Sequence, residues 1–146
     1  VLHVGVSNHT PSQFALLHGQ VPLATNQVEL SPLQLSALTD GTLDQCQALG
    51  IRPMIWSPLA GGRLFTGTDD DARRVRAALD ALALELGISP TTLAYAWILR
   101  HPSRPLPITG SGRIAALREA TSALDVALSR EAWYRIWRAG AGHDVA

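Results

Sequence analysis

Residues 51–62, IRPMIWSPLAGG, form an apolar segment that runs directly into a turn of small and polar residues. Ile51–Trp56 is predicted to be a buried strand, and the serine, proline and glycines that follow predict a tight loop at its end. The same order, an apolar strand and then a polar or glycine-containing turn, recurs at three other places in the chain. This recurrence predicts an α/β protein whose strand ends form a binding face.

The other predicted strands are Val1–Val6, Leu23–Val28 and Leu106–Thr109. Helices are expected between and after them, because capping residues stand before apolar residues spaced three or four positions apart. The predicted helix starts are Thr10, Asp40 (for a helix over 41–49), 69–71, Ser89, the region of Ile114, and Ser129, and a polar loop is expected from Arg63 to Asp71. Strands alternating with helices predict parallel strands that are neighbours in chain order.

The composition is that of one domain with a sizeable core. The chain has 146 residues, 47% of them hydrophobic, and a formal net charge of zero. A neutral chain has no basic field for nucleic acid or an anionic membrane, and no apolar run reaches the roughly 18 residues of a membrane span. The single cysteine, Cys46, indicates a reducing compartment, so a cytoplasmic location is expected.

All twelve basic residues are arginine, so the chain contains no lysine. This excludes a Schiff-base or catalytic lysine within these residues, and it excludes a P-loop. None of the five histidines has metal-ligand spacing with another histidine, a cysteine or a carboxylate, so no metal site is expected.

The turn Gly110-Ser111-Gly112-Arg113 follows the last predicted strand and precedes a helix. Glycines let backbone approach an anion, the helix start presents free N–H groups, and Arg113 can form a fork with phosphate oxygens. The turn satisfies the loose G-x-G-x-x-A dinucleotide pattern, which usually sits on the first strand of its domain. An ordinary strand–helix turn with Ser111 as cap is the other interpretation.

The ends of the other strands carry groups suited to a flat, polar ligand. Trp56 can offer its ring face to a heterocycle, or it can be a core residue. Ser7-Asn8 and Gln27 have hydroxyl and amide groups that can pair with a carboxamide, or can serve as turn and cap residues. Arg63 either reaches a phosphate or is solvated, whereas Asn26 and Glu29 are expected to hold loops.

Taken together and in order, these clusters resemble the C-terminal half of an aldo-keto reductase, over essentially the whole chain. Residues 128–134, LSREAWY, also resemble the last helix of that family. The resemblance implies half of a TIM (β/α)₈ barrel, with parallel strands five to eight and their helices. Because the chain begins at Val1 in mid-element, we expect residues 1–146 to be the C-terminal half, with the N-terminal half absent.

The resemblance also implies NADP(H) as cofactor and assigns residues to it. The residues implied to hold the nicotinamide carboxamide are Ser7, Asn8 and Gln27, and Trp56 is implied to stack on the nicotinamide ring. Those implied to line the pyrophosphate are Ser57, Leu59 and Gly61. Those implied to take the adenosine 2′-phosphate are Gly110, Ser111 and Arg113. Glu119, in Leu117-Arg118-Glu119-Ala120, matches the family's adenine contact, but Ala120 replaces an asparagine.

The family's catalytic aspartate, tyrosine, lysine and histidine have no counterpart in this chain. We therefore expect the cofactor half of an enzyme that reduces an aldehyde or ketone by hydride transfer, inactive in isolation. Its expected partners are a small carbonyl substrate and either the absent N-terminal half or another copy of the chain, paired through open strand edges. The alternative is a non-catalytic nucleotide-binding or regulatory module resembling the potassium-channel β-subunits.

Overall fold

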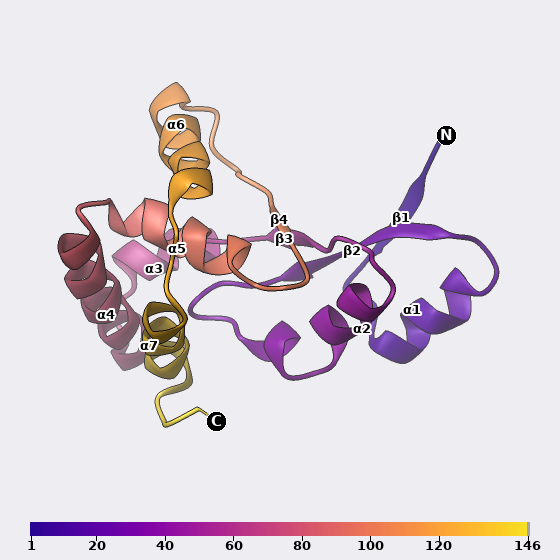
Figure 1. The fold of residues 1–146 in the computed structure, drawn as a ribbon, viewed down its shortest axis with the longest axis horizontal. Coiled ribbons are helices and arrows are strands. Elements are labelled where there is room, and N and C mark those ends of the chain that lie inside the picture. The colour runs from indigo at the N-terminus through magenta and orange to yellow at the C-terminus, as the bar shows by residue number, and fades with distance from the viewer. Residues whose placement is uncertain (146) are drawn as a thin grey trace.

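The computed structural model of the chain describes residues 1–145, which form a four-stranded parallel sheet in chain order (Figure 1). The strands are β1 (Val4–Ser7), β2 (Leu23–Glu29), β3 (Met54–Trp56) and β4 (Leu106–Pro107). In the register, Ser7 lies beside Gln27, Glu29 beside Trp56, and Ile55 beside Pro107. The predicted order and direction of the strands are confirmed, although three of the four strands are shorter than expected.

Helices connect and follow the strands. They are α1 (Pro11–His18), α2 (Thr42–Ala48), α3 (Arg63–Thr66), α4 (Asp70–Leu86), α5 (Pro90–Leu99), α6 (Ile114–Ser122) and α7 (Arg130–Ala141). Thr10 forms the predicted capping box with Gln13 at the start of α1. Ser89 and Ser129 cap α5 and α7 by accepting from the backbone N–H three residues on. These helix starts are therefore confirmed.

Two local expectations were wrong. The segment expected to be a polar loop contains α3, because Leu64 is completely buried in the core and the Thr66 hydroxyl donates to the Gly62 carbonyl. The helix expected over 41–49 begins at Thr42, and its cap position is Gly41, whose φ of 85° suits glycine. The Asp40 carboxylate still accepts from the Thr42 N–H at 2.8 Å, so its capping chemistry is retained.

The core lies between the sheet and the helices α4, α5 and α7, which gather on one side of the molecule in Figure 1. Ile55 of β3, Leu79 of α4 and Ile136 of α7 are fully enclosed there. Trp97 and Trp133 join α5 to α7, because each indole N–H donates to the other residue's carbonyl, at 3.1 and 2.9 Å. Their rings stack with centroids 5.5 Å apart.

The outer strands and α6 are much less covered. Val4 of β1 and Leu106 of β4 are each 40% exposed, and each of these strands has a neighbour on one side only within residues 1–145. No residue of α6, which projects beyond the other helices in Figure 1, is buried. Among the described residues no single helix is long and apolar enough to cross a membrane; α4 and α5 reach that length and hydropathy only together, across a bend of 94°.

Candidate functional site

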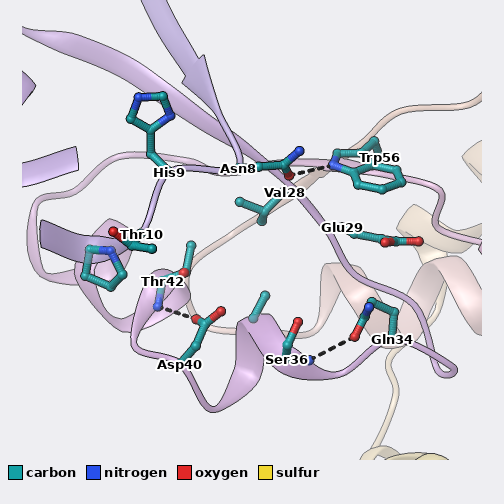
Figure 2. A pocket seen from close by; sticks show the side chains of 12 residues that line it. Asn8, His9, Thr10, Val28, Glu29, Gln34, Ser36, Asp40, Thr42 and Trp56 are labelled. Carbon is teal, nitrogen blue, oxygen red and sulfur yellow. Dashed lines mark hydrogen bonds between the residues drawn. The ribbon is translucent and has the colours of Figure 1, made fainter. Parts of the chain in front are cut away.

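The carboxyl ends of β1, β2 and β3 bring Ser7, Asn8, Gln27 and Trp56 together. The Gln27 carbonyl accepts from both the Ser7 hydroxyl, at 3.0 Å, and the Asn8 N–H, at 2.9 Å. Asn8 has a left-handed backbone, with φ of 55°, and the Trp56 indole N–H donates to its Oδ1 at 3.1 Å (Figure 2). The Asn8 side chain therefore keeps its NH₂ donors free within residues 1–145.

A buried asparagine holds the segment that follows β1. Asn26 is completely enclosed; its Nδ2 donates to the His9 carbonyl at 2.8 Å, and its Oδ1 accepts from the His9 N–H at 3.3 Å. The predicted loop-holding role of Asn26 is confirmed, because both halves of its amide are used on the backbone. This clamp fixes the position from which Asn8 projects.

Trp56 borders two cavities. One, of about 420 Å³, has Asn8, His9, Val28 and Glu29 in its wall, as Figure 2 shows. The other, of about 470 Å³, continues from Trp56 along the loop after β3 to the loop after β4. Its lining residues are Trp56, Ser57, Pro58, Leu59, Gly61, Gly62, Tyr95, Ile108 and Gly110. The two strand-end loops that the sequence predicted as binding loops thus share one cavity.

The loop after β3 has an unusual run of left-handed backbone. Ser57, Ala60, Gly61 and Gly62 have φ values of 49°, 51°, 62° and 92°. At both glycines a Cβ would meet no atom within 4 Å, so the backbone conformation and not crowding favours glycine there. The space beside these glycines leaves their backbone open to a ligand.

The loop after β4 is ordered by its own serine. The Ser111 hydroxyl accepts from the Arg113 N–H at 3.3 Å, and Arg113 occupies the cap position of α6 without a side-chain cap bond. The Arg113 guanidinium is exposed and forms no ion pair with any of residues 1–145. Its charge is therefore available to an anion.

Arg63 and Glu119 are engaged elsewhere and line neither cavity beside Trp56. Arg63 makes a two-pronged pair with Asp69, with N–O distances of 2.8 and 3.2 Å. The Ala72 N–H and the Arg63 guanidinium hold the pKa of the Asp69 carboxyl below its usual range. The Glu119 carboxylate accepts from the Ser89 hydroxyl, which joins α6 to the start of α5.

Sequence reasoning missed Tyr95, which lies on α5 and reaches the second cavity. Every residue from Thr92 to Ile98 is buried, so no helical periodicity distinguishes the cavity side of α5. Across residues 1–145, no group of three or more histidine, cysteine, aspartate or glutamate side chains is placed to hold a metal ion.

Residues 1–140 match the Aldo/keto reductase family. The chain is 52% identical to the oxidoreductase YdhF of Escherichia coli, over 99% of the chain and 49% of that protein. It is 43% identical to a 6-dehydroglucose reductase of Novosphingobium aromaticivorans, over 95% of the chain and 46% of that protein. A crystal structure of a thermostable aldo-keto reductase with the inhibitor epalrestat matches with a TM-score of 0.83 and 26% identity, over 94% of the chain and 48% of that protein.

The four parallel strands with helices between them, together with the match to this crystal structure, define an α/β fold of the partial parallel-barrel class. The chain belongs to the Aldo/keto reductase family. It spans about half the length of the curated relatives that it matches. The predicted family and half-barrel fold are therefore confirmed.

Proposed function

We propose that the chain is the NADP(H)-binding part of an aldo-keto reductase that reduces an aldehyde or ketone. The observation that carries this proposal is the continuous site from Asn8 and Trp56 to Gly110, which joins a hydrogen-bonded amide, an indole and two open loops. An amide and a flat ring suit a nicotinamide, and open backbone beside a helix start suits phosphates.

The residues present fit this cofactor. Asn8 is oriented by Trp56, so that its free NH₂ can donate to a carboxamide oxygen, and the Ser7 hydroxyl and the Gln27 side chain lie on the neighbouring strands. Arg113 is exposed, and within residues 1–145 no carboxylate pairs with it. Its guanidinium is therefore free to bind a 2′-phosphate. When bound, NADPH would supply a hydride.

The remaining roles follow the family resemblance. Trp56 is proposed to lie against the nicotinamide ring, and Ser57, Leu59 and Gly61 to line the pyrophosphate, in the cavity that all four border. Gly110 and Ser111 join Arg113 around the 2′-phosphate. Glu119 is proposed to contact adenine. To do so, its carboxylate would give up the hydrogen bond from the Ser89 hydroxyl and accept one from the base instead.

Proton donation to the carbonyl oxygen needs groups from outside residues 1–146. The chain has no lysine, and none of its residues matches the catalytic set of the family. We therefore propose that a complementary half-barrel completes the enzyme. Because relatives at 43% and 39% identity are named 6-dehydroglucose reductases, an oxidised sugar is the first substrate to test on the completed enzyme.

The test is to titrate the purified chain with NADPH and follow both intrinsic tryptophan and nicotinamide fluorescence. We expect saturable binding without oxidation of NADPH by a reactive aldehyde, since general acid catalysis is worth roughly 10²–10⁴-fold and its donor is missing. If the chain binds neither NADPH nor NADH, the proposal is refuted. Steady oxidation would show that the chain itself supplies the proton.

A further inference from the structure

Tyr95 has a hydroxyl group that the folded chain does not use. The residue is 5% exposed, in the middle of α5, and its side chain forms no hydrogen bond with any of residues 1–145. A phenol that is nine-tenths buried normally has a partner for its O–H. Phenylalanine would fill the same space without the cost of a polar group removed from water.

Tyr95 borders two cavities, and its hydroxyl oxygen is not fully enclosed. Within residues 1–145, the one fully enclosed side-chain polar atom that lacks a partner is Oε1 of Gln45. The Tyr95 oxygen also lacks a partner but is not fully enclosed, so it reaches accessible space. Tyr95 lines the 470 Å³ cavity together with Ser57, Gly61 and Gly110, and it also borders a smaller apolar cavity beneath α6.

Tyr95 is also packed against the loop that follows β3. Leu59 contacts the small cluster formed by Tyr95, Ala96 and Ala123, so α5 forms the floor beneath that loop. Besides the Tyr95 hydroxyl, the side-chain donors in the wall of the 470 Å³ cavity are the Trp56 N–H, which is used on Asn8, and the Ser57 hydroxyl. No charged side chain lines it. Hydroxyl groups and open backbone N–H groups can donate hydrogen bonds to the oxygens of an anion where no charged side chain is present.

We infer that Tyr95 is a further cofactor-binding residue, whose hydroxyl donates a hydrogen bond to a diphosphate oxygen of the bound dinucleotide. This inference rests on the proposed function. It assigns Tyr95 a role different from that of Arg113: a diphosphate is common to NADPH and NADH, whereas the 2′-phosphate belongs to NADPH alone. The two residues therefore have separable effects on cofactor choice.

The test is Tyr95→Phe, with Tyr134→Phe as the matched control, because Tyr134 lies on α7 and lines neither cavity beside Trp56. Dissociation constants of the purified chain for NADPH and NADH are measured by fluorescence titration. We expect Tyr95→Phe to weaken both cofactors in the same proportion, by about tenfold, the lower end of the effect of a hydrogen bond to a charged group. Tyr134→Phe leaves both constants unchanged.

Urea unfolding without cofactor provides the second measurement. Tyr95→Phe is expected to be as stable as the parent chain, because the Tyr95 hydroxyl has no hydrogen-bond partner to lose among residues 1–145. If the parent chain binds the cofactors and Tyr95→Phe binds them equally well, the role of Tyr95 is overturned and the proposed function stays intact. A loss confined to NADPH, or a marked loss of stability, would also overturn it. If the parent chain binds neither cofactor, the proposed function fails, and this inference fails with it.

Discussion

Arg113 is one of the arginines that have no carboxylate partner among residues 1–145. Within residues 1–145 five arginines form ion pairs: Arg63, Arg73, Arg74, Arg135 and Arg138. Arg113 stands instead at the exposed start of α6, beside the loop after β4. A cation in this position is suited to read a phosphate group.

We predict that Arg113→Ala weakens NADPH binding and hardly changes NADH binding. A hydrogen-bonded charge pair to phosphate contributes about 1.5–3 kcal/mol, which is roughly a 10- to 100-fold change in dissociation constant. The control is Arg118→Ala, an exposed arginine on the same helix. Equal losses for both cofactors would show that Arg113 does not read the 2′-phosphate.

His101 is the residue whose titration should affect folding. Burial lowers the pKa of its imidazole, and the Asp44 carboxylate opposes this only in part. The Ser103 N–H donates to its Nδ1 at 3.2 Å, which requires that nitrogen to be unprotonated. Burial and this hydrogen bond both favour the neutral imidazole of His101 in the folded protein.

We predict that the chain loses stability as the pH falls below the ordinary histidine pKa. Because the folded pKa lies below the unfolded one, the unfolded chain takes up the proton first, so acid favours unfolding in this window. His101→Asn keeps an acceptor near the Ser103 N–H but cannot titrate, so it should flatten the dependence between about pH 7.5 and pH 5. Urea unfolding at each pH measures this, with His143→Asn as control; identical slopes in the two variants would contradict it.

At the scale of elements, α7 depends on its cap and on its contacts with α4 and α5. The Ser129 hydroxyl accepts from the Ala132 N–H at 3.1 Å, and Ile136 on the same helix is fully buried. Glu85 of α4 pairs with Arg135 through two hydrogen bonds, of 2.8 and 3.0 Å. The helix thus starts at a local signal and is held by distant partners.

We predict that Ser129→Ala lowers the free energy of unfolding by about 0.5–2 kcal/mol, the usual value of an N-cap. Ser129→Asp keeps an acceptor for the Ala132 N–H and adds a negative charge at the helix start, so it should retain most of the stability. Chemical denaturation of the three proteins makes the comparison. A loss in Ser129→Asp as large as in Ser129→Ala would mean that packing around Ser129, and not its cap bond, is what matters.

At the scale of the whole molecule, the half-barrel has two open sheet edges. β1 and β4 each pair on one side within residues 1–145, and the apolar Val4 and Leu106 on them are partly exposed. Leu117 on α6 and Leu124 just after it are exposed as well. Open edges and apolar surface favour association with another chain.

We predict that the purified chain self-associates at tens of micromolar, and that sedimentation velocity will detect dimers or larger species. Adding the half of the relative YdhF that this chain does not match should replace self-association with a one-to-one complex of the two half-barrels. A compact monomer with cooperative unfolding, unaffected by the added half, would contradict the prediction.

Much of the architecture was readable in the amino-acid order. The helix starts at Thr10, Ser89 and Ser129 were predictable, because an N-cap hydrogen bond joins residues three positions apart and does not depend on distant parts of the chain. The order of the strands followed from the handedness of strand–helix–strand connections. The strand-end residues Asn8, Gln27 and Trp56 could be named in advance, because parallel strands all end at the same edge of a sheet.

Other features depend on groups far apart in the chain and became visible only in the folded molecule. The helix α3 exists because Leu64 finds a place in the core, and Arg63 lies beside Asp69 because α3 turns into α4. The Trp56 N–H meets Asn8 across 48 positions of sequence, and Tyr95 reaches the cavity from a helix buried on every side. The amino-acid sequence predicts hydrogen bonds between residues that are near neighbours in the chain. Contacts between distant residues depend on how the helices and strands pack, and so they are visible only in the tertiary structure.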